Sequence, residues 1–297
     1  MTEPPRTQSA QAPSLPLAAP GVLMPYGFEG RRQHEAAFST AEHWLQVTCA
    51  LPAPADLDGH IWRAHVQLRE RPDGELVVTS ARRADRLDPL SLIAPSACQL
   101  PGVVAEFLSL AASIRTAPLR RCLSEVFTRR VVFENFWHVA AAPDHHHWRG
   151  GLAWHTLEVL RALDANSARR SEGAGSWSQA ERDLAIVAAW LHDVAECEDG
   201  GEPASVAAEA RRHTGTLRHH EFITEPLKNL GRADCALAEA LLALGCPGPP
   251  VTAGPLRVDS IRQQLLRSHR MSETSTIRPL PDRYAVMFDR IVGITRH

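Results

Sequence analysis

Apolar and polar residues alternate along the segment from about Ala41 to Leu90, with the period of two that is typical of β-strands. Three stretches carry this pattern: HWLQVTCAL, HIWRAHVQLRE and ELVVTSARRA. The turn sequence Pro72-Asp73-Gly74 separates the last two and predicts a hairpin. The pattern therefore predicts a small β unit of three strands, which are too few to name a barrel.

The pattern changes after Pro95, where apolar residues recur at spacings of three and four, as they do in helices. Two helices separated by Pro118 come first. Further helices are predicted over residues 152–169, 180–196, 205–230, 233–244, 258–269 and 282–294, and Ser178 and Glu181 have the spacing of a capping box at the start of the second of these. We expect a mainly α fold over residues 96–297, preceded by a small, OB-like β unit over residues 21–95. Residues 1–20, rich in Pro, Ala, Ser and Gln, are expected to form a disordered tail.

Charge and composition exclude several classes of protein. The 297 residues include 32 Lys and Arg against 34 Asp and Glu, so the net charge of −2 gives no overall field that attracts nucleic acid or anionic membrane. Any such contact has to be local. No apolar run approaches the length of a membrane span, about 18 residues, and the first residues lack the pattern of a signal peptide. We expect a cytoplasmic protein that does not contact membranes, and its oligomeric state is open.

Histidine is unusually frequent, with 15 residues, and it is clustered. Three consecutive histidines, His145 to His147, come shortly before His155, and His192-Asp193 lies at the edge of a strongly apolar helical stretch. His155 shares a helix face with apolar neighbours, so it points toward the core. Two helices packed side by side would bring two imidazoles and a carboxylate together, and these are ligands that suit a divalent transition metal. The alternative for each histidine alone is an ordinary buried side chain.

The stretch PDHHHWRGGLAWHTLEVLRAL, followed by AAWLHDVAE, resembles the HD-domain metal phosphohydrolases, which place a His, a His-Asp pair and a distal Asp on helices. It is most similar to the YhaM-type 3′-to-5′ exoribonucleases, which have a small oligonucleotide-binding β unit before the HD core. Their IxxxPLRxLL-like run resembles IRTAPLRRCL here. The triple histidine in FWHVAAAPDHHH also resembles the HD-like TraI domain of MobH-type conjugative relaxases.

The resemblance implies a helical HD bundle and a set of site residues. It implies that His155, His192 and Asp193 bind one divalent metal, with Asp289 as the fourth ligand, and that His220 or the neighbouring His219 binds a second one. The expected ions are Mn²⁺, Mg²⁺, Fe²⁺ or Ni²⁺. Asp193 would also orient the attacking water. Residues at the mouth of the site would donate a proton or hold phosphate: His145, His146, His147 and Arg149.

The first functional hypothesis is a metal-dependent phosphodiesterase that acts on single-stranded RNA or DNA from the 3′ end. In this hypothesis Trp44 and Trp62 stack on bases and the arginines at 82, 83 and 86 contact phosphates, although core packing is the alternative for both tryptophans. A second hypothesis is a relaxase-like DNA-processing protein that works with conjugation or mobile-element machinery. A third is a degenerate HD protein that binds nucleic acid or a partner without turnover. It is motivated by Glu196, which stands where a lysine often follows the HD pair, and by the missing histidines near residues 244–246, where the exoribonucleases have SHHG. Hydrolysis of a free nucleotide is a fourth.

Overall fold

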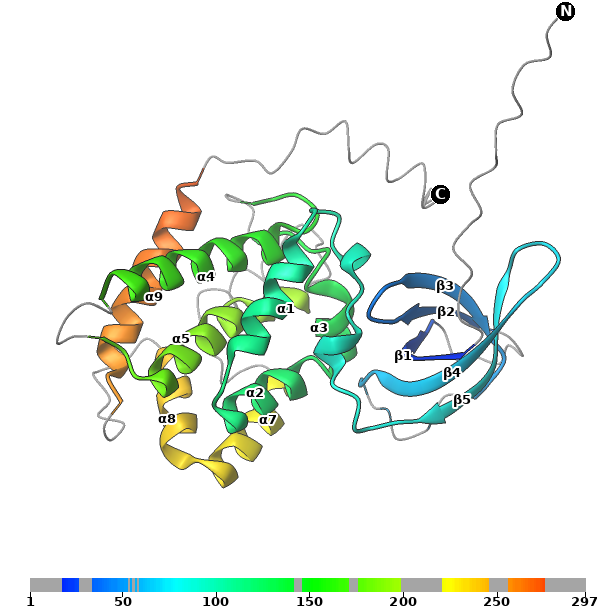
Figure 1. Cartoon of the computed structure of the whole chain (residues 1–297), viewed down its shortest axis with the longest axis horizontal. Coiled ribbons are helices and arrows are strands. Elements are labelled where there is room, and N and C mark those ends of the chain that lie inside the picture. Colours follow the sequence, from blue (N-terminus) through cyan, green and yellow to red (C-terminus); the bar gives the residue numbers. More distant parts are fainter. Residues whose placement is uncertain are drawn as a thin grey trace, which may run out of the picture.

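The structure is a computed structural model, and it describes residues 18–26, 34–52, 54, 57, 59–141, 146–170, 176–198, 221–245 and 256–275. A β-barrel lies at one end of a group of packed helices (Figure 1). No helix in these ranges is both long and apolar enough to cross a membrane.

The barrel is closed by five strands: β1 (Ala18–Pro25), β2 (His34–Ser39), β3 (Trp44–Cys49), β4 (Trp62–Glu70) and β5 (Leu76–Arg83). Their order around the barrel is β1-β2-β3-β5-β4, with β1 also paired to β4. Neighbouring strands are antiparallel except β3 and β5, which pair in parallel. The predicted hairpin is the β4–β5 connection, where Gly74 has a φ of +85° that favours glycine.

The alternation pattern does not predict two of these strands, β1 and β2, because both of their faces are buried. In β1, Leu23 points into the barrel core, whereas Val22 and Met24 belong to the core shared with the helices. In β2, Phe38 points inward and Ala37 points toward the helices. A strand covered on both sides has no polar face to alternate with. Residues 18–20, predicted as part of the tail, belong to β1.

The mainly α class predicted for the chain is therefore wrong. The segment from Ala18 to Arg83 forms a complete five-stranded mixed barrel, not a three-stranded appendage. The described residues form a β-barrel followed by a helical half, so the fold class is mixed α and β.

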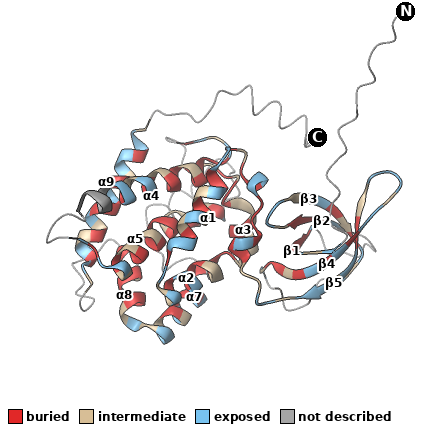
Figure 2. Ribbon diagram, viewed as in Figure 1, coloured by how far each residue is buried: buried red, intermediate tan, exposed pale blue. Residues whose placement is uncertain are grey.

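The helical half begins with two short 3-10 segments, η1 (Pro89–Leu92) and η2 (Pro95–Ala97). Its α-helices are α1 (Val103–Ser113), α2 (Ala117–Val126), α3 (Arg130–Asn135), α4 (Gly151–Arg170), α5 (Gln179–Leu191), α7 (Glu221–Ala233), α8 (Cys235–Leu244) and α9 (Val258–Glu273), and a 3-10 turn η3 (Val194–Cys197) follows α5. Buried residues line the facing sides of these helices (Figure 2). The predicted helix 180–196 ends early, at Leu191, and of the predicted helix 205–230 only the part from residue 221 is described. The predicted helix 282–294 lies outside the described residues.

The barrel and the helical half share one packed boundary. The amide of Ile61 donates to the carbonyl of Thr128 (2.8 Å), and the amide of Arg130 donates to that of Gly59 (2.8 Å). The Trp44 ring stacks on Phe133 at 6.1 Å between centroids. Trp44 is therefore an interface residue and Trp62, 5% exposed, is barrel core. Core packing, the alternative for both tryptophans, is what the structure shows.

Candidate metal centre

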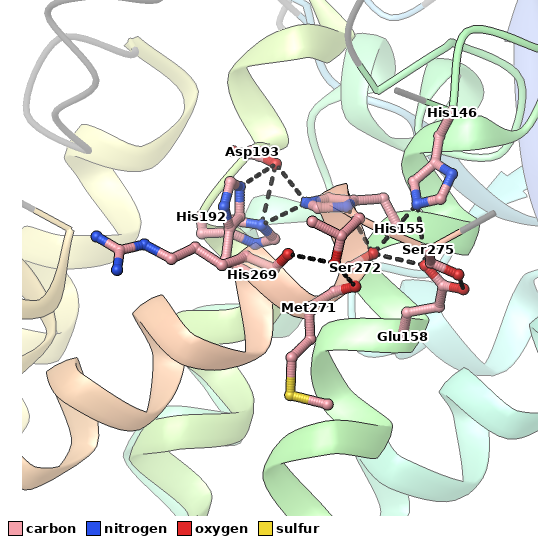
Figure 3. Close-up of polar contacts among 11 residues, drawn as sticks. His146, His155, Glu158, His192, Asp193, His269, Met271, Ser272 and Ser275 are labelled. Atoms are coloured by element: carbon pink, nitrogen blue, oxygen red, sulfur yellow. Dashed lines mark hydrogen bonds and ion pairs between the residues drawn. The ribbon is translucent and has the colours of Figure 1, made fainter. Parts of the chain in front are cut away.

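Four side chains that can bind a metal converge where α4, α5 and α9 meet: His155, His192, Asp193 and His269. One ligand atom from each lies within 4.8 Å of the others. Figure 3 shows the four side chains pointing toward one another from three separate segments of the chain. The site is therefore built by packing of helices that are distant in sequence.

Two consecutive residues at the end of α5, His192 and Asp193, both belong to this group. Neighbours in a regular helix point about 100° apart. His192 still has helical dihedrals, but Asp193 leaves the helix with φ −117° and ψ 16°. Both side chains lie toward His155, whose Nε2 is 3.2 Å from Asp193 Oδ2 and 3.2 Å from His192 Nε2.

The four ligand atoms are closely spaced. Asp193 Oδ2 lies 2.9 Å from His192 Nε2, 3.2 Å from His155 Nε2 and 3.8 Å from His269 Nε2. His155 Nε2 and His192 Nε2 are 3.2 Å apart. Ligands of a tetrahedral ion with bonds of 2.0 to 2.1 Å are separated by about 3.4 Å. The spacing therefore matches that of a metal-binding set.

Each imidazole is held by an oxygen atom at its other nitrogen, Nδ1. His192 Nδ1 lies 2.6 Å from the carbonyl of Ala189, and His269 Nδ1 lies 3.4 Å from the Glu273 carboxylate. His155 Nδ1 lies 2.9 Å from Ser272 Oγ. A carbonyl or carboxylate at Nδ1 can only accept, so Nδ1 carries a proton, and in the neutral ring Nε2 carries the lone pair. This arrangement of outer acceptors is typical of metal-bound histidines.

The electrostatics of the cluster keep His155 and Asp193 in metal-binding protonation states. Burial lowers the pKa of His155 to about 4, against the opposing effect of Asp193, so its imidazole is neutral at pH 7. Burial would raise the pKa of Asp193, but the charge of His192 and hydrogen bonds from the surrounding imidazoles hold that pKa well below its usual range. The carboxylate is therefore ionised and the deepest histidine is neutral.

The donor set and its exposure fit a transition metal. Four atoms that carry lone pairs repel one another unless a positive charge lies between them. Three imidazoles and one carboxylate suit Fe²⁺, Ni²⁺ or Zn²⁺ better than Mg²⁺, which prefers an all-oxygen set. The His155 side chain has no exposed surface, while Asp193 and His269 are 27% and 28% exposed. A ligand would therefore reach the centre from the side of Asp193 and His269.

Three of the residues predicted to bind metal, His155, His192 and Asp193, lie together. Asp289, the expected fourth ligand, and His220, expected at a second ion, lie outside the described residues, as do His145 and His219. The fourth member of the group, His269, was missed by the sequence reasoning. It follows Ile261 and Leu265 at intervals of four, so its place on the inner face of α9 was readable from the pattern.

The residues predicted at the mouth of the site are differently placed. His146 is 2% exposed and lies behind His155, with its Nε2 2.9 Å from Glu158 Oε2, so its placement at the mouth is wrong. His147 and Arg149 are exposed. The Arg149 charge acts on the buried His138 and Cys98, which do not belong to the four-residue group. No structural contact links Arg149 to that group among the described residues.

Comparisons with known proteins add nothing to this geometry: no family model matches the chain, and no curated protein or solved structure is significantly similar to it.

Proposed function

We propose that the protein is a divalent-metal-dependent phosphohydrolase of the HD type that cleaves phosphodiester bonds in single-stranded RNA or DNA. The observation that supports it most is the convergence of three Nε2 atoms on Asp193 Oδ2, each ring being held at Nδ1 by an outer oxygen. A buried histidine that serves packing alone needs no such common target.

The residues of the chain have separate tasks in this proposal. His155, His192 and His269 would hold the ion through Nε2, and Asp193 would hold it through one carboxylate oxygen. A divalent ion held there would supply the chemistry of lowering the pKa of a water molecule and neutralising charge on the phosphate. Asp193, at the open side of the centre, is the residue that we assign to hold and orient the attacking water. His155 closes the floor and excludes solvent there.

Nucleic acid as the substrate rests on the barrel. Five-stranded OB barrels bind oligonucleotides along exposed strands and loops, with backbone contacts from basic side chains. Exposed arginines lie along and just after β4 and β5 in this barrel, at 69, 82 and 86. Arg83, in contrast, is engaged by Asp85 at 2.7 Å. Because Trp44 and Trp62 are packed elsewhere, we assign strand binding to charge on this face and not to stacking on these rings.

The test uses purified protein loaded with Mn²⁺ and 5′-labelled single-stranded RNA and DNA, with products resolved by length. We expect a ladder that shortens from the 3′ end with wild-type protein and is absent with His192→Ala/Asp193→Ala. The control is Lys228→Ala, which removes an exposed charge on α7, away from the barrel face and the metal centre, and should retain full activity. A metal-loaded wild type that leaves both polymers intact contradicts the proposed substrate.

Other outcomes of the same experiment identify the alternatives. A single discrete cut in DNA contradicts exonucleolytic cleavage and supports a relaxase-like protein. Hydrolysis of free nucleotides without cleavage of polymers moves the substrate to small molecules. Binding of labelled strands with no turnover by any metal-loaded form supports a degenerate protein. Less than one bound ion per chain, measured after loading, contradicts the metal centre itself.

A further inference from the structure

A second set of polar side chains lies behind His155, on the side away from Asp193 (Figure 3). Its members are Ser272, Glu158, His146 and Ser275. Ser272 Oγ lies 2.9 Å from His155 Nδ1 and donates to Glu158 Oε2 at 2.6 Å. His146 Nε2 lies 2.9 Å from the same carboxylate oxygen, and Ser275 Oγ donates to Glu158 Oε1 at 2.9 Å. The Glu158 carboxylate thus gathers three hydrogen-bond donors.

The direction of these hydrogen bonds decides which ring nitrogen of His155 carries the proton. A serine hydroxyl has one hydrogen, and that of Ser272 is given to Glu158. Its oxygen can therefore only accept from His155 Nδ1. With the ring proton on Nδ1, the lone pair of His155 is on Nε2, the atom that faces Asp193. The carboxylate of Glu158 thus determines, through one hydroxyl, which nitrogen of His155 can bind metal.

The backbone at His146 is in an unfavourable conformation, which this arrangement of side chains requires. His146 has a φ of +50°, the only positive φ of a non-glycine residue among the described residues. Its carbonyl lies against Gly151, where a Cβ atom would collide with it. A non-glycine residue in this conformation costs of the order of 1 to 3 kcal/mol and persists only where its surroundings hold it. Here it places a buried imidazole on Glu158.

We propose that Ser272 and Glu158, supported by His146, are positioning residues of the metal centre that fix the tautomer and ring orientation of His155. This inference rests on the proposed metal centre. None of the three belongs to the group that would bind the ion, so they act through His155 alone. Loss of outer partners of this kind weakens metal binding by about 10- to 100-fold, and we expect Ser272→Ala and Glu158→Gln to fall in that range.

The experiment compares Ser272→Ala with Ser268→Ala in the full-length protein. Ser268 is buried on the same helix one turn earlier, and its hydroxyl has no hydrogen-bond partner among the described residues. Both variants lose one buried oxygen, but only one loses the contact to His155. Titration with Co²⁺ alone should give a dissociation constant about 10- to 100-fold higher for Ser272→Ala than for wild type, and within about twofold of wild type for Ser268→Ala.

Proton NMR of the Co²⁺ form provides a readout that general destabilisation would not produce. Wild-type protein should show one shifted, exchangeable Nδ1–H signal for each metal-bound histidine. We expect the His155 signal to shift in Ser272→Ala, because its Nδ1–H loses its acceptor, and the signal of His192, which donates to the backbone, to stay unchanged. Glu158→Gln leaves the serine in place and provides the same test if Ser272→Ala fails to fold.

The outcomes separate this inference from the proposed function. Equal Co²⁺ affinity and equal signals in Ser272→Ala and Ser268→Ala overturn the positioning role and leave the metal centre intact. A wild-type protein that binds no Co²⁺ overturns both. Tight Co²⁺ binding without cleavage of any strand, together with a weakened Ser272→Ala variant, supports the positioning role and contradicts the nuclease.

Discussion

Helix α5 carries buried carboxylates near its start, and a partly exposed carboxylate lies just past its end. The two groups differ in the partners that surround them. At the start, Asp183 Oδ2 accepts from the amides of Arg115 (3.0 Å) and Thr116 (2.7 Å), and from the Thr116 hydroxyl (2.7 Å). At the end, Asp193 Oδ2 faces the Nε2 atoms of three imidazoles, each of which can carry either a proton or a metal ion. One carboxylate is surrounded by fixed amide and hydroxyl donors, and the other by nitrogens that can bind a metal.

This difference separates a structural cluster from a metal-binding one. A buried carboxylate that receives several N–H and O–H groups is satisfied and holds segments together. Asp183 thereby connects the end of α1 to α5, and Glu181 connects α5 to Arg257 at the start of α9. A carboxylate among imidazole nitrogens that can each release a proton can instead share a cation with them. The chemistry of the neighbouring atoms, more than burial, therefore identifies the functional site.

The largest expected effect is the loss of the ion from Asp193→Asn. This change keeps the shape of the side chain but removes the negative charge that faces three imidazoles. We expect Co²⁺ or Mn²⁺ affinity to fall by more than about 100-fold, beyond the range of outer-partner substitutions, and turnover to disappear with it. Calorimetric titration measures the first and strand cleavage the second. Retention of one tightly bound ion would break the comparison.

The matched change at the other end, Asp183→Ala, should affect stability instead. It leaves two buried amides and a hydroxyl without their acceptor, and each such group costs about 1 to 3 kcal/mol. We expect the free energy of unfolding in urea to fall by about 3 kcal/mol or more, while the folded fraction binds metal as wild type does. A variant of normal stability, or one that folds but binds no metal, would contradict the assignment of Asp183 to a structural role separate from the metal centre.

Acid should act on the two clusters in different pH windows when metal is removed with a chelator. Burial lowers the pKa of His155 to about 4, so the unfolded chain binds this proton first and stability falls as the pH drops from 6.5 toward 4. The hydrogen bonds from Arg257 lower the pKa of Glu181 to about 2, and its contribution is lost between pH 4.5 and 2. The raised pKa of His269 has the opposite sign: its contribution is present below pH 6.5 and is lost as the pH rises through its folded value.

Urea unfolding at successive pH values measures both windows. His155→Gln should flatten the curve between pH 6.5 and 4, and Glu181→Gln should flatten it below pH 4.5. Added metal should shift the upper window to lower pH because protons and metal compete for the same imidazole. A chelated protein with the same stability at pH 6.5 and pH 4.5 would contradict the neutral, buried state of His155.

Periodicity located much of the fold and failed where a segment is buried on two sides. It predicts β3, β4 and β5, and most of α4, α8 and α9, because each of these has one solvent-exposed face. It misses β1 and β2, since Leu23 and Phe38 face the barrel while Val22, Met24 and Ala37 face the helices. Without these two strands the pattern predicts only three strands, which are too few for a barrel, and therefore a mainly α fold.

The site was predictable as far as local patterns reach. The pairing of His155 with His192 and Asp193 follows from two apolar helices that each carry a histidine near their inner face. His269 and Ser272 depend on how α9 crosses α4, and a single sequence does not state that crossing. The family resemblance places His146 at the mouth, whereas the positive φ at this residue and the close approach of its carbonyl to Gly151 turn it inward.

The smallest expected effect comes from Ser178→Ala, which weakens the structural cluster at its edge. Ser178 Oγ accepts from the amide of Glu181 at 3.3 Å, and its own amide donates to Glu181 Oε2 at 2.7 Å. Loss of the capping hydroxyl costs about 1 kcal/mol, and Glu181 keeps its hydrogen bonds from Arg257. Thermal unfolding should show this small loss while metal affinity stays within about twofold of wild type, given that the cap lies more than three turns from His192 along α5. A tenfold weaker metal affinity in this variant would mean that the two ends of α5 are not independent, and that hydrogen bonds at its start help to position the metal ligands at its end.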